Sequence, residues 1–201
     1  MGFIAFLLDW FVDTIVHFKW LATQELLYSN IGLSWLVFVV IGVVLMFMAA
    51  CLTAYVGPAA LGSGVAEAMG FLNGVIYPEF IHVKRLFTKI VGVMFAVAAG
   101  LCGGKEGPLV HIGSNVGVMT LYLPFKYCKY FQNDHEKRKF IAIGLAAGVA
   151  AAFGAPIGGS LFAYELSKPN TFWSFSLTWR VFFACSMSTF FLNIFKSLQM
   201  Y

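Results

Sequence analysis

The chain has 201 residues, of which 60% are hydrophobic and only 11% are charged, and its formal net charge is +4. Soluble domains are about one quarter charged, so a single soluble core of this size cannot bury so much apolar surface. The composition, with a mean hydropathy of +0.83, therefore predicts an integral membrane protein. The positive charge is spread over loops and forms no single basic patch, so nothing indicates a nucleic-acid partner.

The first apolar stretch, residues 3–21, is predicted to be helical. Asp9, Asp13 and His17 recur every four residues, which places them on one face of that helix. This face is expected either to turn toward protein or to lie at the membrane interface, and the sequence leaves both possibilities open. The first residues lack the basic start and the small-residue cleavage site of a signal peptide.

The clearest spanning helix follows a polar turn predicted at residues 23–30. Residues 31–55 are 25 residues without a charge, which is long enough to cross a bilayer with some tilt. Gly57-Pro58 is expected to end this helix.

A second interruption follows at Gly62-Ser63-Gly64, before a short segment over residues 65–74. Ser63 places a hydroxyl between two glycines, and such a turn can present both O–H and N–H donors to an ion. A plain turn is the alternative. The ion-binding interpretation gains support from a second broken segment around Gly104, because interrupted apolar segments are typical of transport sites.

The central stretch, residues 100–108, lies between two apolar segments and contains a Lys-Glu pair. Ionisable groups at membrane depth indicate an ion pathway. The glycines release the backbone from a helix, and Pro108 suits the first turn of a new one. A helix that starts inside a membrane directs unpaired N–H groups and a partial positive charge outward, which attracts an anion. Glu106 can occupy the position of that anion or leave it.

The same stretch has two alternatives to an anion site. Glu106 could be a helix-capping acid that pairs with Lys105. A phosphate-binding loop needs glycine, four spacers, then Gly-Lys-Ser/Thr; here Ala99 takes the first position and Glu106 replaces the hydroxyl residue, so that pattern does not fit. No nucleophile elbow, paired metal histidines or close Ser/His pair is present in the sequence, so we expect no enzyme, no cofactor and no metal.

The connecting segments are predicted from their polarity. Residues 76–89 are semi-polar and are expected to form a connector or tilted helix that enters an apolar helix over residues 90–100. Residues 126–139 are the only strongly polar run and are expected to be a solvated loop, with a weak preference for the cytoplasmic side. The four cysteines, which are far apart, are interpreted as structural: Cys51, Cys102, Cys128 and Cys185.

The second part of the chain is rich in small residues. Gly144/Gly148 and Gly154/Gly158 form small-xxx-small pairs within residues 140–164, and Gly113/Gly117 and Gly100/Gly104 repeat the pattern. Such pairs let helix backbones approach closely in lipid. Ala155-Pro156 predicts a break, and residues 172–195 predict a final aromatic-rich span. Together the segments predict six or seven helices in an all-α fold.

These motifs resemble the CLC chloride channels and chloride/proton exchangers. The resemblance runs from about residue 3 to residue 195 and closes on a stretch similar to the eukaryotic endosomal and lysosomal branch. It rests on Gly62-Ser63-Gly64, Phe71–Gly74, Gly104–Pro108, the alanine-rich run Ala146–Gly159, and Leu161–Glu165.

The resemblance implies that residues 1–201 are the first half of a multi-helix CLC transport domain, with broken and re-entrant helices and no cytoplasmic regulatory domain. It implies a chloride channel in a membrane crossed several times, either endosomal/lysosomal or plasma membrane, with chloride as the transported ion. Glu106 would be the gating glutamate. The implied anion-binding residues are Ser63, Gly64, Lys105, Glu106 and Gly107. The implied partner is a second copy or a full-length relative.

Three departures from the family pattern matter. The Gly-Ser-Gly motif continues with Val65-Ala66, where the family has Ile-Pro. Leu166 stands where exchangers carry a second glutamate for internal proton transfer, which favours a channel over an exchanger, although an exchanger remains the alternative. The chain covers about half of a transport domain, so a non-conducting subunit or a gene fragment is the alternative of another class.

Overall fold

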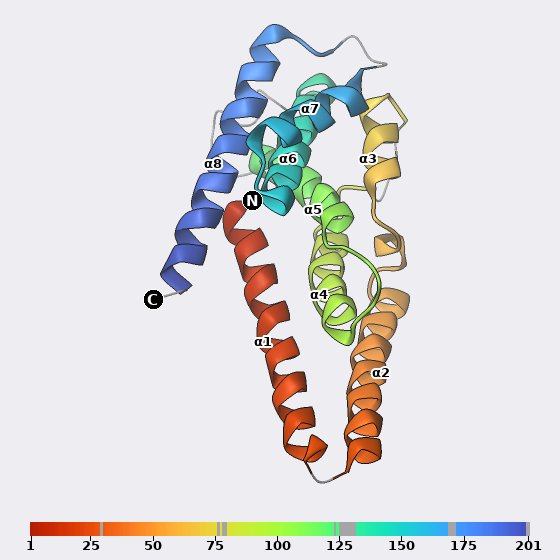
Figure 1. Cartoon of the computed structure of the whole chain (residues 1–201). Coiled ribbons are helices and arrows are strands. Elements are labelled where there is room, and N and C mark those ends of the chain that lie inside the picture. Colours follow the sequence, from red (N-terminus) through yellow and green to blue (C-terminus); the bar gives the residue numbers. More distant parts are fainter. Residues whose placement is uncertain are drawn as a thin grey trace.

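The structure is a computed structural model, and it describes residues 1–28, 30–75, 77, 80–122, 124, 132–168 and 172–199. Over these residues it is all-α with no strand, as expected. The elements in chain order are α1 (Gly2–Leu27), α2 (Ile31–Tyr55), the 3-10 turn η1 (Pro58–Ala60), α3 (Val65–Leu72), α4 (Val83–Ala99), α5 (Glu106–Met119), the 3-10 turn η2 (Thr120–Tyr122), α6 (Asp134–Phe153), α7 (Pro156–Ser167) and α8 (Phe175–Gln199). Figure 1 shows α1 and α2 as a long pair that extends from a bundle of the other helices.

The pair of α1 and α2 is tied to the end of α4 by a buried lysine. The Nζ atom of Lys19 donates to the carbonyl oxygen of Ala99 at 3.0 Å, and it lies 3.8 Å from the ring centroid of Phe38. The prediction of a turn at residues 23–30 is wrong for residues 23–27, because α1 continues to Leu27. That segment has no glycine or proline, and its glutamine, glutamate and leucines are good helix formers.

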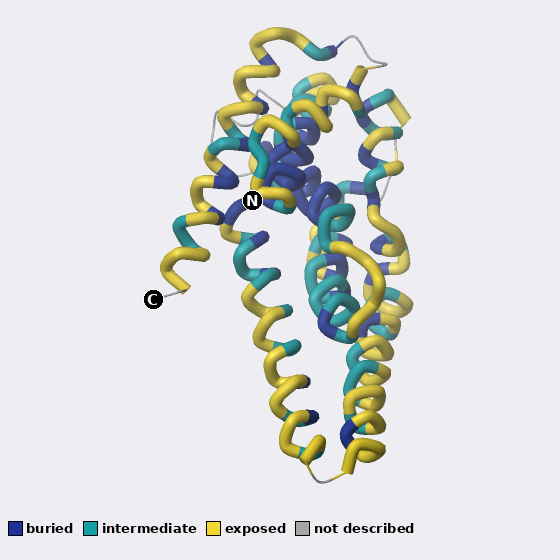
Figure 2. Tube along the Cα trace, viewed as in Figure 1, coloured by how far each residue is buried: buried dark blue, intermediate teal, exposed yellow. Residues whose placement is uncertain are grey.

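Two helices in the described part of the chain, α2 and α8, are long and apolar enough to cross a membrane. The predicted bounds of residues 31–55 agree with α2. Only 6% of the most apolar window of α2 is buried, and Figure 2 shows mostly exposed residues along the extended pair. A helix that is apolar all round and still exposed needs a cover of lipid or protein.

The core centres on the crossing of α5 and α6, where buried residues gather (Figure 2). A Cβ atom added at Gly113 would lie 2.3 Å from the carbonyl oxygen of Gly144, and one at Gly148 would lie 2.4 Å from that of Leu109. The two backbones therefore touch directly, which confirms the close approach predicted from the small-residue pairs. Gly100 and Gly104 lie in the loop between α4 and α5, and Gly154 and Gly158 lie on either side of the break between α6 and α7, so these two of the four predicted pairs do not form a helix crossing.

The predicted break before Pro156 is confirmed. Gly154 has a left-handed φ of +65° and ends α6, and Pro156 begins α7. Residues 140–164 thus divide between α6 and α7, and residues 65–72 form a helix of their own. The described residues therefore hold eight α-helices, more than the six or seven expected.

One segment expected to be a solvated loop is partly helical. Asp134–Lys139 form the start of α6, stabilised by acids in the first turn and by i,i+3 pairs of Lys137 with Asp134 (3.1 Å) and Lys139 with Glu136 (2.7 Å). Residues 126–131 of the predicted polar loop, which include Lys126, Cys128 and Lys129, lie outside the described residues. Residues 76–89, expected to be a connector or a tilted helix, are helical from Val83 onward, where they form the start of α4.

The first and last helices, α1 and α8, pack against each other. A Cβ at Gly2 would lie 2.2 Å from the carbonyl oxygen of Ser188, and the rings of Phe3 and Phe6 contact that of Phe195 at 5.2 and 5.4 Å. The start of α1 is therefore packed against α8, as Figure 1 shows.

Candidate anion site

The helix predicted to break at residues 100–108 does break. Gly100 ends α4 with a left-handed φ of +100°, and α5 begins at Glu106. The first backbone N–H groups of α5 have no acceptor within the helix, since only from Leu109 does the repeating bond form, to the carbonyl oxygen of Lys105 at 3.0 Å. The structure therefore has the exposed helix start that an anion site requires.

The Gly-Ser-Gly turn has the backbone that its glycines predict. Gly62 and Gly64 have φ values of +75° and +81°, in the left-handed region that glycine adopts without strain. Ser63 lies between them, and its Oγ accepts a hydrogen bond of 3.4 Å from the amide of Val65 at the start of α3. This turn holds the hydroxyl at the point where α3 begins.

The two interrupted segments lie against each other, although they are far apart in the sequence. A Cβ at Gly107 would lie 2.8 Å from the Cβ of Ser63 and 3.8 Å from its Oγ, so only glycine fits there. A Cβ at Gly64 would lie 2.7 Å from the Cβ of His111, one turn further along α5. The starts of α3 and α5 are therefore in contact.

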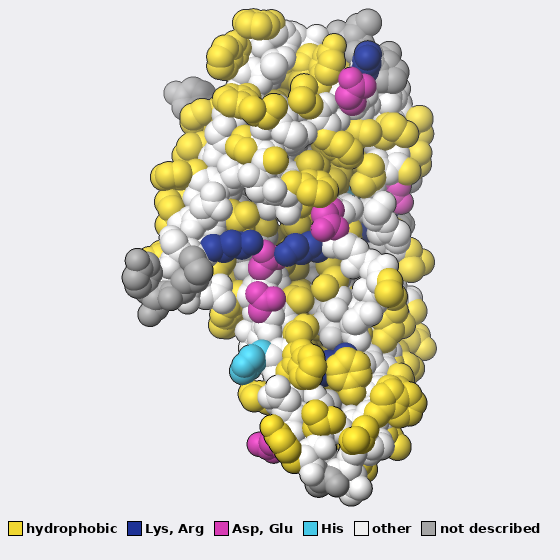
Figure 3. Space-filling model, viewed as in Figure 1, with side chains coloured by type: hydrophobic (Ala, Val, Ile, Leu, Met, Phe, Trp, Pro, Cys, Tyr) yellow, Lys and Arg dark blue, Asp and Glu magenta, His cyan; other side chains and the backbone are white. Residues whose placement is uncertain are grey.

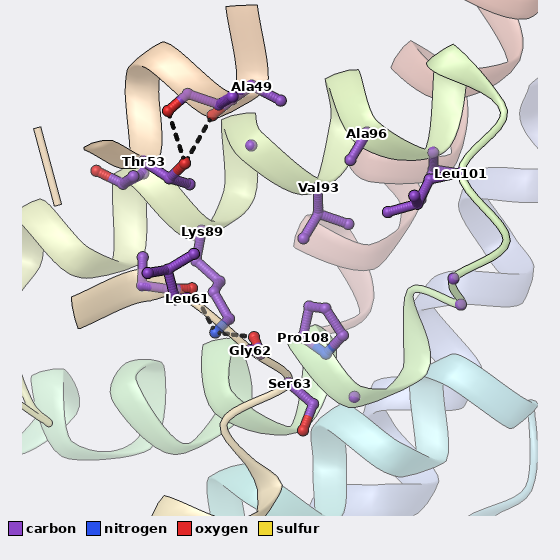
Figure 4. Close-up of a pocket in the computed structure, with 18 of the residues that line it drawn as sticks. Ala49, Thr53, Leu61, Gly62, Ser63, Lys89, Val93, Ala96, Leu101 and Pro108 are labelled. Carbon is purple, nitrogen blue, oxygen red and sulfur yellow. Dashed lines mark hydrogen bonds between the residues drawn. The ribbon is translucent and has the colours of Figure 1, made fainter. Parts of the chain in front are cut away.

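A cavity of about 680 Å³ opens at this contact (Figure 4). Among the predicted site residues, Ser63, Glu106 and Gly107 line it, and Gly64 and Lys105 do not. The rest of the lining is mostly apolar and comes from α2, α4, the loop before α5 and the first turn of α5; examples are Ala49, Val93, Ala96, Leu101 and Pro108.

Glu106 is the first residue of α5, and its side chain is half-buried. Its carboxylate folds back over the preceding loop: a Cβ at Gly104 would lie only 1.7 Å from Oε2 of Glu106. Gly104 therefore provides the space in which the carboxylate lies. This places a negative group at the start of α5, next to the amides that an anion would use.

Lys89 was not among the predicted site residues. Its side chain is buried, and its Nζ donates to the carbonyl oxygens of Ala60 (2.9 Å) and Gly62 (2.6 Å), as Figure 4 shows. It lines the same cavity and fixes the turn that carries Ser63. A sequence signal exists, because Lys89 is the last charge before the apolar half of α4. One turn earlier, Arg85 forms an ion pair with Glu67 of α3.

Lys105 points away from the cavity. Its ammonium forms an ion pair with Asp9 of α1, and the second carboxylate oxygen of Asp9 lies 3.0 Å from Nζ of Lys196 in α8. The pairing of Lys105 with Glu106 that a capping interpretation implied is replaced by the pair with Asp9. Of the three residues predicted to share one face of the first helix, Asp9 turns toward protein, whereas Asp13 and His17 are exposed.

Leu166 lies in α7 and packs, half-buried, against the main hydrophobic core. Asn73 donates to its carbonyl oxygen at 3.3 Å. The neighbouring Glu165 is exposed and lies 3.7 Å from Lys168. Among the described residues, no group of three or more His, Cys, Asp or Glu side chains could hold a metal ion.

This arrangement of broken helices is that of the CLC transport proteins. The structure resembles the crystal structure of a slow cyanobacterial Cl⁻/H⁺ antiporter with a TM-score of 0.81 and 27% identity, covering 96% of this chain and 44% of that one. It also resembles the crystal structure of a eukaryotic CLC transporter, with a TM-score of 0.77 and 25% identity, covering 96% of this chain and 35% of that one.

A family profile described as voltage gated chloride channel matches residues 44–201. Chloride channel protein D of Dictyostelium discoideum is 37% identical over 98% of this chain, and H(+)/Cl(-) exchange transporter 7 of Bos taurus is 36% identical over 98%. This chain belongs to the voltage-gated chloride channel family. It spans 20% and 26%, respectively, of the lengths of these two relatives.

Proposed function

We propose that the cavity between α2, α4 and the starts of α3 and α5 is the anion site of a chloride pathway gated by Glu106. One observation carries this proposal: Ser63 contacts Gly107, and both line a single cavity with the carboxylate of Glu106. A hydroxyl donor, a helix start and a competing acid are thus gathered at one point.

The chemistry of the site suits a small anion. The Ser63 hydroxyl and the first amides of α5 are donors, and the α5 start carries a partial positive charge. Lys89 adds a buried cation nearby. The Glu106 carboxylate has the same sign as chloride, so the two compete for the same donors. Rotation or protonation of Glu106 releases the position to chloride, and acid on the facing side is expected to open the pathway.

A passive channel is the form of this function that Leu166 favours. Its side chain is apolar and packs in the core, so it cannot carry a proton at the position where exchangers of the family use a glutamate. Exchange of chloride for protons is the second candidate, because relatives of this chain are named both as channels and as H⁺/Cl⁻ exchange transporters.

The test is anion flux from liposomes that contain the purified chain, with proton movement recorded at the same time. We expect chloride to move without protons and expect Glu106→Ala to abolish the activation by acid. Glu165→Ala is the matched control, because Glu165 is an exposed glutamate whose nearest ion-pair partner is Lys168 at 3.7 Å. Uphill proton movement driven by a chloride gradient would contradict the channel and support the exchanger.

We propose further that a second protein surface completes the pathway, supplied by another copy of the chain or by a full-length relative. The support is that the wall of α2 is apolar and mostly exposed, so it needs a cover of lipid or protein. Flux from vesicles holding one chain each would refute this. Flux that appears only on co-reconstitution with a full-length relative would identify a subunit. Imaging a tagged chain against endosomal, lysosomal and plasma-membrane markers tests the compartment.

A further inference from the structure

Lys105 is the exception in the loop that leads into α5. The residues on both sides of it, Gly104 and Glu106, line the cavity, but Lys105 does not. Its ammonium is instead paired with the carboxylate of Asp9, nearly a hundred residues earlier in the chain. The nearest acid in the sequence, Glu106, is not its partner in any ion pair of the described residues.

Asp9 holds two cations from two different elements. One carboxylate oxygen is paired with Lys105, at the start of α5, and the other lies 3.0 Å from Nζ of Lys196, in α8. The Asp9 side chain is 15% exposed, whereas those of the lysines are 36% and 48% exposed. Ion pairs in a shielded network are stronger than isolated surface pairs. Figure 3 shows positive and negative side chains gathered on one face between hydrophobic bands.

We propose that Asp9 is a positioning residue that keeps the ammonium of Lys105 out of the anion cavity. Lys105 lies between two cavity residues, so its side chain can reach the cavity once it is released. The nearest negative groups would then be Glu106 and any bound anion. With Asp9 in place, Lys89 is the cation that lines the cavity, and the competition between Glu106 and an anion proceeds without a second lysine.

This inference rests on the proposed function, because the cavity matters only as an anion site. It adds a regulatory element to that site. The acid on α1 sets the charge in a cavity that α1 does not line, and Lys196 of α8 shares the same acid. A change in how α1 and α8 pack at this point would therefore change the potential at Ser63 and Glu106.

The experiment measures the potential in the cavity directly and needs no chloride flux. Ser63, which is exposed in the cavity wall, is replaced by cysteine after the native cysteines are changed to serine. In detergent micelles, the modification rates of this thiol by an anionic and by a cationic methanethiosulfonate are compared. The two reagents differ in charge by two units, so their rate ratio reports the local potential.

Asp9→Asn is expected to raise the ratio of anionic to cationic modification about tenfold, since one ammonium enters the cavity. The matched control is Asp13→Asn, one turn further along α1, where the acid is exposed and forms no ion pair among the described residues. It should leave the ratio unchanged. Asp9→Asn combined with Lys105→Met should return to the parent ratio. An unchanged ratio in Asp9→Asn, or an effect that persists without Lys105, would overturn the proposal.

A second variant covers the case in which Asp9→Asn fails to fold. Lys105→Met alone keeps the pair of Asp9 with Lys196 and should have the parent ratio, because Lys105 is outside the cavity. A fall in the ratio would show that Lys105 already contributes its charge there, and the proposal would be wrong. If the chain proves inactive in the flux assay, these rates still decide the role of Asp9, so failure of the proposed function and failure of this inference give different results.

Discussion

The contact between Ser63 and Gly107 makes a sharp prediction about Gly107→Ala. The added Cβ would lie 2.8 Å from the Cβ of Ser63, about 1 Å closer than two carbon atoms pack. The turn that carries the hydroxyl must therefore move away from the start of α5. A hydrogen bond to a charged group contributes about 1.5–3 kcal/mol, so losing the Ser63 donor should weaken anion binding roughly tenfold to 150-fold.

The assay is titration of the purified chain with chloride or bromide in detergent. Gly103→Ala is the control from the same loop: its added Cβ would meet only the Leu101 side chain, at 3.6 Å, which is an ordinary contact. It should bind as the parent does. Ser63→Gly in the Gly107→Ala background should relieve the crowding without restoring affinity. The reasoning is refuted if Gly107→Ala binds as tightly as Gly103→Ala.

Two further variants test the residues that support the site. Gly113→Ala should lower the free energy of unfolding by about 1–3 kcal/mol, because its Cβ would lie 2.3 Å from the Gly144 carbonyl oxygen. Gly32→Ala is the control and should not lower it, because its Cβ would have nothing within 4 Å; denaturation in micelles compares the two variants. Lys89→Met should weaken anion binding at least tenfold, since it removes a buried cation and leaves the carbonyls of Ala60 and Gly62 without its donors; parent-like affinity on titration would contradict the role given to Lys89.

Local sequence features determined the elements that matter most for the site. Three features can be predicted without a tertiary structure, because each acts through its own length or backbone preferences. They are the uncharged run of α2, the glycines and proline around the start of α5, and the Gly-Ser-Gly turn. The glycine pairs likewise predicted that two helices touch. They did not predict which helices, because the partner of a small-residue face is set by the whole bundle.

The missed features depend on contacts between distant segments. The resemblance implied that Lys105 binds the anion, but its ammonium pairs with Asp9, and no local pattern links these positions. Lys89 lies in a segment whose sequence indicates only a semi-polar connector or tilted helix, because its importance comes from the distant carbonyls of Ala60 and Gly62 that it binds. The extension of α1 and the start of α6 differ from the prediction for a simpler reason: their polar residues have good helix propensity, although polar runs usually indicate turns.

The direct backbone contact of α5 with α6 limits how a gate at Glu106 can work. Tilting α5 toward its neighbour would drive the Gly113 backbone into the Gly144 carbonyl, where even one added methyl group has no room. The amides that face the cavity therefore belong to a helix that packs backbone against backbone on α6. In the proposed gate, rotation of the Glu106 carboxylate about its own side-chain bonds, a movement on the scale of rotamers, can open the site without any tilt of α5 toward α6.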